Sequence, residues 1–136
     1  MTQNRDFTKY DVTLNKEVFE RLAKRQAIFK LVKYLCDNAV NPDDIAKLFS
    51  WYKGVFRSVE WKVDSKTYTE KFLEHNKQFG TKSEPNRYFC DDDQLIYAND
   101  RTYALTKMWG RHTAKALGLL IGQYGNLGIQ FSESDS

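Results

Sequence analysis

The stretch that decides the expected fold runs from Asp44 to Val59 and reads DIAKLFSWYKGVFRSV. Its apolar residues have the spacing of a helix-turn-helix unit, because Ile45 lies on a first helix while Phe56 and Val59 anchor a second helix three residues apart. Ser50 occupies the turn between the two helices. In proteins that bind DNA through this unit, the second helix enters the major groove. The stretch therefore predicts a binding module.

Three side chains of the second helix are expected to point outward, namely Tyr52, Lys53 and Arg57. Arginine reads guanine in the major groove, whereas lysine and tyrosine contact phosphates, so all three are predicted DNA-binding residues. The alternative is a structural three-helix cluster that packs without touching DNA. The aromatic start of the helix at Trp51 and Tyr52 favours that alternative.

The length and composition of the chain favour one folded domain. A chain of 136 residues is long enough for a substantial core and too short for two domains. Its 41% apolar and 15% aromatic content favours a globule over a disordered chain. No stretch approaches the roughly 18 apolar residues that cross a bilayer, and residues 1–6 lack the apolar segment of a signal peptide. We therefore expect a single domain over residues 1–136, in the cytoplasm and with no membrane partner.

Positive charge is concentrated in the first half of the sequence. Residues 1–62 hold 12 Lys and Arg against 8 Asp and Glu, whereas residues 63–136 hold 9 against 10. This excess accompanies the helix-turn-helix candidate and fits contact with phosphates, so Lys24 and Arg25 are also predicted to bind DNA. Surface helices that bind nothing carry similar excesses, and this alternative stays open.

Helical signals are clearest between residues 24 and 49. A helix over residues 24–38 is predicted, because one buried face is formed at helical spacing by Ile28, Leu31, Val32, Leu35 and Cys36. A second helix begins at Pro42, because proline suits the first turn and Asn41 suits the N-cap position. This helix is expected to run to about residue 49.

Two more helices and two loose ends complete the expected helical part. One helix covers residues 16–22, after an arm formed by residues 1–15. The other covers residues 66–79 and ends at Gly80, a residue that adopts the left-handed conformation common after helices. Residues 132–136 are expected to form a mobile tail.

The second half of the chain carries strand signals. Runs rich in β-branched and aromatic residues occur at 87–90, 94–97 and 102–106, and turn residues separate them. They predict a small antiparallel meander, followed by a helix over residues 111–124 and an edge strand at 129–131. The expected fold class is therefore α+β, in which a helical bundle with the helix-turn-helix-like unit precedes a β-meander and a C-terminal helix.

A sequence block in this second half resembles a known family. The runs Arg87–Asp93 and Thr102–Thr106, followed by Trp109-Gly110, are similar to a block of the form TYALxxxWG. Together with three upstream runs at residues 24–27, 41–45 and 56–59, they resemble small bacterial modules, some of which accompany restriction-type or other DNA-processing proteins. The resemblance spans roughly residues 20–131 and implies a DNA-related function without a catalytic residue. Lys107-Met108 departs from the Asn-Gln pair of that family.

Two further positions are candidates for contact with phosphates. The turn at residues 99–101 follows the pattern of a wing beside a helix-turn-helix, and would place Arg101 on the DNA backbone. Gly110 precedes a helix whose first turn holds Arg111, where free N–H groups and the helix dipole suit a phosphate or carboxylate. The structural alternatives are an ordinary hairpin turn and a Trp109 side chain that fills the core.

No motif predicts a metal site or a catalytic residue. The carboxylates of Asp91–Asp93 alternate in direction on an extended chain and do not converge on a cation. Glu60-Trp61-Lys62 matches half of a metal-dependent nuclease site but lacks a second acid. The potential zinc ligands have no usable short spacing: His75, His112, Cys36 and Cys90. We expect two reduced core cysteines, no metal, no cofactor and no enzymatic activity.

Two functional hypotheses follow from these observations. The first is a non-catalytic module that binds double-stranded DNA and works beside a nuclease or regulator, through Lys24, Arg25, Tyr52, Lys53, Arg57 and Arg111. The second is a protein-interaction module, for example a phage or mobile-element protein that binds a host defence or replication component, with contacts from Tyr52, Trp61 and Tyr68. A continuous basic face around Arg57 favours the first, and an apolar patch around Trp61 and Tyr68 favours the second.

Overall fold

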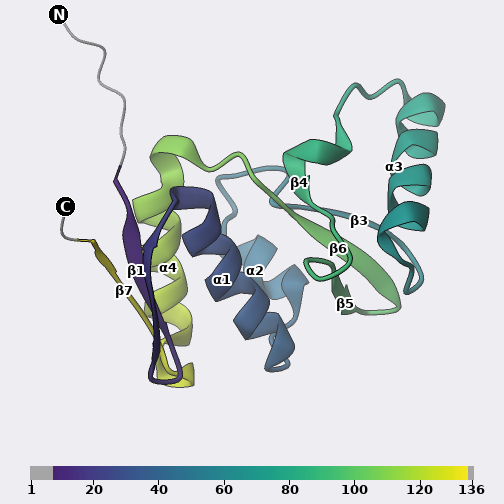
Figure 1. Ribbon diagram of the computed structural model, residues 1–136. Helices are drawn as coiled ribbons and strands as arrows, with labels where there is room; N and C mark the ends of the chain where they lie inside the picture. The colour runs from purple at the N-terminus through teal and green to yellow at the C-terminus, as the bar shows by residue number, and fades with distance from the viewer. Residues whose placement is uncertain (1–7, 135–136) are drawn as a thin grey trace, which may run out of the picture. The chain divides into compact units, whose positions relative to one another are not determined.

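The computed structural model describes residues 8–134 and has an α+β fold with two antiparallel sheets (Figure 1). The chain divides into two compact units: unit 1 contains the residues up to Tyr34 and from Trp109 onward, and unit 2 contains Leu35–Met108. The expectation of a single domain stays a prediction. Among the described residues, no helix has the length and apolar content needed to cross a membrane.

A three-stranded antiparallel sheet forms one layer of unit 1. Its strands are β1 (Tyr10–Leu14), β2 (Glu17–Leu22) and β7 (Ile129–Glu133), in the order β2-β1-β7. The tight turn between β1 and β2 consists of Asn15 and Lys16, which both have positive φ, at 50° and 78°. A two-residue turn with two left-handed residues matches the twist of paired strands and therefore closes a hairpin.

This hairpin corrects two predictions for the start of the chain. The predicted arm over residues 1–15 is wrong for Tyr10–Leu14, which pair with both β2 and β7, while residues 1–7 lie outside the described part. The predicted helix over residues 16–22 is wrong because these residues form β2. Phe19 faces Val12 across the hairpin, whereas Val18 points outward and is 55% exposed. Cross-strand pairing therefore overrides the short helical pattern.

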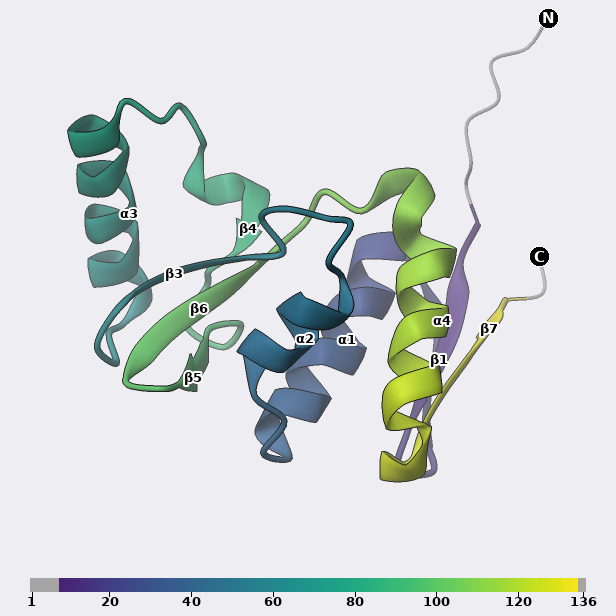
Figure 2. The same ribbon diagram turned by 180° about the vertical axis from the view of Figure 1, so that it is seen from behind.

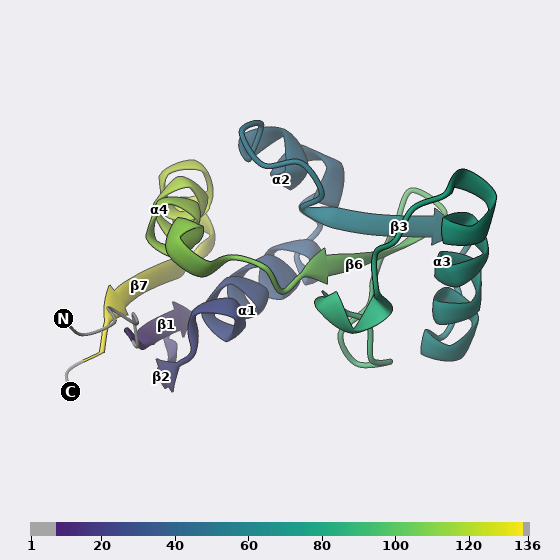
Figure 3. The same cartoon turned by 90° about the horizontal axis from the view of Figure 1, so that it is seen from above.

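Two helices form the other layer of unit 1 (Figures 1 and 3). They are the segment of α1 (Lys24–Asp37) up to Tyr34, and α4 (Thr113–Tyr124). The ammonium of Lys30 on α1 lies 4.5 Å from the ring centroid of Phe19 on β2. The hydroxyl of Tyr34 donates a hydrogen bond of 2.9 Å to the carbonyl of Leu127, which precedes β7.

The helices predicted over residues 24–38 and 111–124 correspond to α1 and α4, and the predicted apolar face of α1 is buried at Ile28, Leu31, Val32 and Leu35. The predicted helix over residues 24–38 is confirmed to within one residue. The predicted helix over residues 111–124 begins as a 3-10 turn at Gly110–His112 and becomes α4 at Thr113. The buried face of α4 consists of Thr113, Ala116, Leu117 and Leu120. The edge strand expected at 129–131 is confirmed and extends to Glu133, so a tail from residue 132 is wrong for its first two residues.

The helices of unit 2 begin and end where their capping residues predict. In α2 (Pro42–Leu48), the Asn41 side chain accepts a hydrogen bond of 2.9 Å from the N–H of Asp43. In α3 (Ser65–Phe79), the Asp64 carboxylate accepts one of 2.8 Å from the N–H of Thr67. Gly80 ends α3 at a φ of 67°. These side chains satisfy N–H groups that have no partner within the first turn of a helix.

The sheet of unit 2 is built around β6 (Arg101–Thr106). One edge of β6 pairs with β3 (Phe56–Glu60), and the other pairs with the short strands β4 (Tyr88–Phe89) and β5 (Ile96–Ala98). The expected meander is therefore wrong in its connections, because β4 and β5 both pair with β6 and β3 is an additional strand. Figure 2 shows β3 and α3 from behind.

The predicted helix-turn-helix is wrong, since the residues of its second helix form the strand β3. Phe56 packs edge-on against the Tyr103 ring, at 5.8 Å between centroids. Val59 lies in a cluster with Tyr68 and Phe72 of α3. Residues three apart on a strand point to opposite faces, whereas on a helix they share one face. The spacing of Phe56 and Val59 therefore fits a strand between two packed layers, and the helical bundle expected around it is not formed.

Candidate functional site

The six predicted DNA-binding residues are divided between the two units. Lys24, Arg25 and Arg111 belong to unit 1, and Tyr52, Lys53 and Arg57 belong to unit 2. Without a second helix after Phe49, the last three residues share no helical face. The predicted residues of the two units therefore belong to separate candidate surfaces.

Tyr52 has a structural role in unit 2. Its hydroxyl donates a hydrogen bond to the main-chain carbonyl of Met108, and its ring lies 5.8 Å from that of Trp51. Burial raises the pKa of the Tyr52 hydroxyl. The prediction that Tyr52 points outward from a recognition helix is wrong, whereas Lys53 lies exposed in the turn before Gly54.

Arg57 is held against α3 by two side chains of that helix. Its guanidinium donates hydrogen bonds of 3.0 Å to His75 Nδ1 and 2.9 Å to Asn76 Oδ1. The guanidinium carbon also lies 4.1 Å from the ring centroid of Phe72. Arg57 is therefore not the freely projecting side chain that reading a base edge requires.

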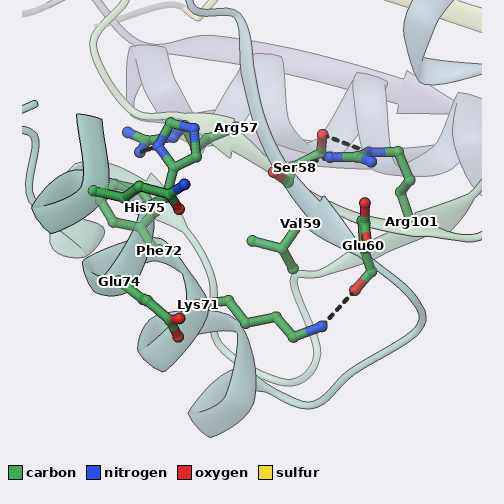
Figure 4. A pocket seen from close by; sticks show the side chains of 10 residues that line it. Arg57, Ser58, Val59, Glu60, Lys71, Phe72, Glu74, His75 and Arg101 are labelled. Carbon is green, nitrogen blue, oxygen red and sulfur yellow. Dashed lines mark hydrogen bonds between the residues drawn. The ribbon is translucent and has the colours of Figure 1, made fainter.

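A groove lies beside Arg57 and has a volume of about 340 Å³ (Figure 4). We name it the β3–α3 groove. One wall is formed by residues 57–60 of β3, and the other by residues of α3: Lys71, Phe72, Glu74, His75 and Gln78. Arg101 of β6 lines its end. Positions 71, 74, 75 and 78 share one face of a helix, so this polar face was a signal in the sequence that the prediction missed.

Each cation of the β3–α3 groove contacts a neutral group. Lys71 Nζ donates a hydrogen bond of 2.9 Å to the carbonyl of Glu60. Arg101 Nε donates one of 3.0 Å to Ser58 Oγ, and its Nη2 lies 3.5 Å from the Ser58 carbonyl. Within residues 8–134, the carboxylates of Glu60 and Glu74 form no ion pair with these cations. The groove therefore presents three oriented cations whose charge is not neutralised by direct contact.

The hairpin turn at residues 99–101 is confirmed, but it is not a wing. Asn99 and Asp100 have φ values of 54° and 56°, as a two-residue turn between β5 and β6 requires. The Asn99 amide donates hydrogen bonds to Asn41 Oδ1 and to the hydroxyl of Tyr103. Arg101 turns back to Ser58 instead of projecting from the tip.

Trp61 and Tyr68 do not form the apolar patch that was expected. Tyr68 is fully buried, and its hydroxyl donates a hydrogen bond of 2.9 Å to the carbonyl of Arg57. Trp61 is 61% exposed and adopts a φ of 71°, which is rare for a bulky side chain. A surface that contains both aromatic rings is therefore excluded.

The unit 1 candidates lie in a strongly basic part of the protein. Its described residues, 8–34 and 109–134, hold nine Lys and Arg against four Asp and Glu. Unit 2 holds 11 against 12. The positive excess thus follows the compact unit, which combines both ends of the chain, more closely than it follows the first half of the sequence.

Cations also occupy the beginnings of both unit 1 helices. Lys24 and Arg25 lie in the first turn of α1, and Arg111 lies in the 3-10 turn before α4. Neither helix has an acidic residue in its first turn. Both begin at the same end of unit 1 (Figures 1 and 2). Because the helix dipole favours acidic residues there, this arrangement adds positive potential at an already positive helix end.

The residues considered for metal or nucleophilic chemistry do not form a site for either, as the following contacts show. Residues 8–134 contain no group of three or more His, Cys, Asp or Glu suited to a metal ion. Asp92 instead accepts a hydrogen bond of 2.8 Å from the N–H of Ser65. Cys36 and Cys90 are not joined in a disulfide, and both are half-buried. Burial, followed by the charge of Asp91, raises the pKa of the Cys90 thiol and opposes formation of a reactive thiolate.

Comparison with known proteins adds no family or fold relationship. No protein-family model, no curated protein and no solved structure matches the chain. The resemblance to modules with a TYALxxxWG-like block stays a prediction. In the structure, residues Thr102–Thr106 of this block lie in β6, and Trp109 is 1% exposed while Gly110 has a φ of 48°. A structural role for Trp109 and Gly110 is thus supported by packing and backbone geometry.

Proposed function

We propose that this protein is a non-catalytic accessory module that binds duplex DNA through the cations of unit 1. The observation that supports the proposal is the presence of Lys24, Arg25 and Arg111 at two helix beginnings, in a unit with nine basic and four acidic described residues. The recognition helix of the sequence-based hypothesis has no part in this proposal, because its residues form β3.

The physical basis is the attraction of a basic surface for the phosphate backbone. Helix N-terminal N–H groups and nearby Lys or Arg side chains are common ligands of phosphate oxygens. Such contacts release condensed counterions, so the affinity falls steeply as salt increases and depends little on base sequence. Arg25 and Arg111 are both exposed, as contact with a phosphate requires. Unit 2, with a small acidic excess, contributes little to this attraction.

Removal of Arg25 or Arg111 is expected to weaken binding to duplex DNA of any sequence. Fluorescence anisotropy with a labelled duplex, repeated across salt concentrations from about 50 to 200 mM, measures the effect. Arg25→Gln and Arg111→Gln should each lower the affinity and reduce the slope of log K against log salt by about one.

Lys53→Gln provides the matched control, because Lys53 is an exposed cation of unit 2. It should bind DNA as the wild type does. An equal loss of DNA affinity in all three variants would contradict the proposal, because binding would then depend only on the total charge of the protein. An absence of DNA binding at low salt would also refute the proposal.

A further inference from the structure

The strand β3 has one edge without a partner strand. In the order β3-β6-β4, β3 lies at the margin of the sheet. The Val55 carbonyl accepts a hydrogen bond from the N–H of Thr106, and the N–H of Trp61 donates to the Asp100 carbonyl. Along an antiparallel strand, every second residue forms its main-chain hydrogen bonds with the same neighbouring strand. Because Val55 and Trp61 are bonded on the β6 side, the main-chain groups of Ser58 and Glu60 point away from β6.

Side chains cover the outward carbonyls of this edge. Lys71 reaches the Glu60 carbonyl at 2.9 Å, and the Arg101 guanidinium lies 3.5 Å from that of Ser58. Within residues 8–134, the N–H groups of Ser58 and Glu60 have no hydrogen-bond partner. Charged side chains on an edge strand oppose unspecific strand pairing, and they also define which charges a specific partner needs.

The β3–α3 groove follows this same edge. Four consecutive residues of β3 form one wall, and they correspond to about 13 Å of extended chain. The other wall is the polar face of α3, from which Lys71 and His75 line the groove (Figure 4). A groove between an edge strand and a helix is a common site for a peptide that adds a strand to a sheet.

We propose that the β3–α3 groove binds an extended, acidic segment of a partner protein by strand addition to β3. The N–H groups of the segment replace Lys71 and Arg101 on the Glu60 and Ser58 carbonyls. Both cations then pair with carboxylates of the segment, while its own carbonyls accept from the N–H groups of Ser58 and Glu60. This interaction involves unit 2 and is independent of the DNA-binding function proposed for unit 1.

The alternation of side chains along a strand explains why an acidic segment fits. Successive side chains of an added strand point to opposite faces of the sheet. Those on one face meet Arg57 and Lys71, and those on the other meet Arg101. Glu60 and Glu74 repel a fully acidic chain, so carboxylates separated by apolar residues suit the groove better than an unbroken acidic run.

The test uses a fluorescent peptide in which valine and glutamate alternate, and a second peptide in which lysine replaces glutamate. Only the acidic peptide should bind the full chain, as measured by anisotropy. Lys71→Ala should weaken its binding about three- to tenfold, the effect of losing a partly exposed charge pair. Lys77→Ala is the matched control, since Lys77 is exposed on α3 outside the groove and should have no effect.

Two further measurements distinguish strand addition from simple charge attraction. Hydrogen exchange at the Ser58 and Glu60 amides should slow when the acidic peptide is bound. Ser58→Pro removes an N–H that points away from the sheet, a position where edge strands tolerate proline, and should abolish binding without unfolding the protein. Unchanged exchange, equal binding of the lysine peptide or an absence of binding would each overturn the proposal. If free glutamate bound as tightly as the acidic peptide, strand addition would be excluded and the groove would be a simple anion site.

Discussion

At the scale of single residues, left-handed backbone conformations shape the surface of unit 2. Asn99 and Asp100 both adopt this conformation in the turn between β5 and β6, and Trp61 adopts it directly after β3. The N–H of Trp61 donates a hydrogen bond of 2.7 Å to the carbonyl of Asp100. The turn therefore determines where β3 ends.

Replacement of Asp100 by glycine should stabilise the protein. Glycine adopts a φ of 56° without steric strain, and Asn-Gly is the preferred sequence for this turn. We expect Asp100→Gly to increase the free energy of unfolding by about 0.5–1 kcal/mol, because relief of the left-handed strain outweighs the entropic cost of glycine, and urea denaturation measures the change. Asp100→Ala retains the strain of a side chain at positive φ and should show no such gain. A loss of stability in Asp100→Gly would contradict the turn geometry.

At the scale of elements, the β3–α3 groove is formed by a capped helix that lies beside an unpaired strand edge. The Asp64 cap fixes the start of α3, and the buried rings of Tyr68 and Phe72 attach the helix to β3. One turn further along, α3 places Lys71 and His75 beside the edge of β3. The polar face of the helix is therefore positioned by the apolar face beside it.

The Asp64 cap should make stability depend on pH at low pH. Hydrogen bonding to the N–H of Thr67 lowers the pKa of Asp64 below its unfolded value. A lowered folded-state pKa contributes stability above the unfolded pKa of about 3.9, and this contribution is lost as the pH falls through the folded value. Asp64→Ala should therefore unfold at lower urea than the wild type at neutral pH, with a smaller difference at low pH. A difference that is constant with pH would exclude this linkage, and Asp64→Asn should retain most of the cap at neutral pH.

At the scale of the whole molecule, charge is distributed by unit. Unit 1 brings the two ends of the chain together and concentrates basic residues. Unit 2 is a continuous segment with nearly balanced charge, and its groove holds cations next to carboxylates. The two proposed surfaces therefore use different residues for different ligands.

These surfaces should respond separately to substitution. Arg25→Gln and Arg111→Gln are expected to weaken DNA binding and to leave binding of the acidic peptide unchanged, because neither residue lines the groove. Lys71→Ala should have the opposite effect. Titration of each ligand against all three variants, at one salt concentration, measures this independence. Parallel losses of both ligands in one variant would show that the surfaces are coupled.

The sequence by itself determined most helix boundaries and turns. Asn41, Asp64 and Gly80 act through hydrogen bonds and backbone angles within a few residues, so their effects can be read locally. The same holds for the apolar periodicity of residues 24–38. The polar face of α3 was also present in the sequence, but its meaning depended on the strand beside it.

Only the tertiary structure decided the strands at residues 10–14, 17–22 and 56–60. β1 pairs with β7 from the far end of the chain, and β3 pairs with β6 more than 40 residues later. Short apolar runs satisfy both helical and strand spacing, and the choice depends on a partner that is distant in sequence. The same long-range pairing creates the free edge of β3 and gathers the cations of unit 1, which is why neither binding surface was visible as a local motif.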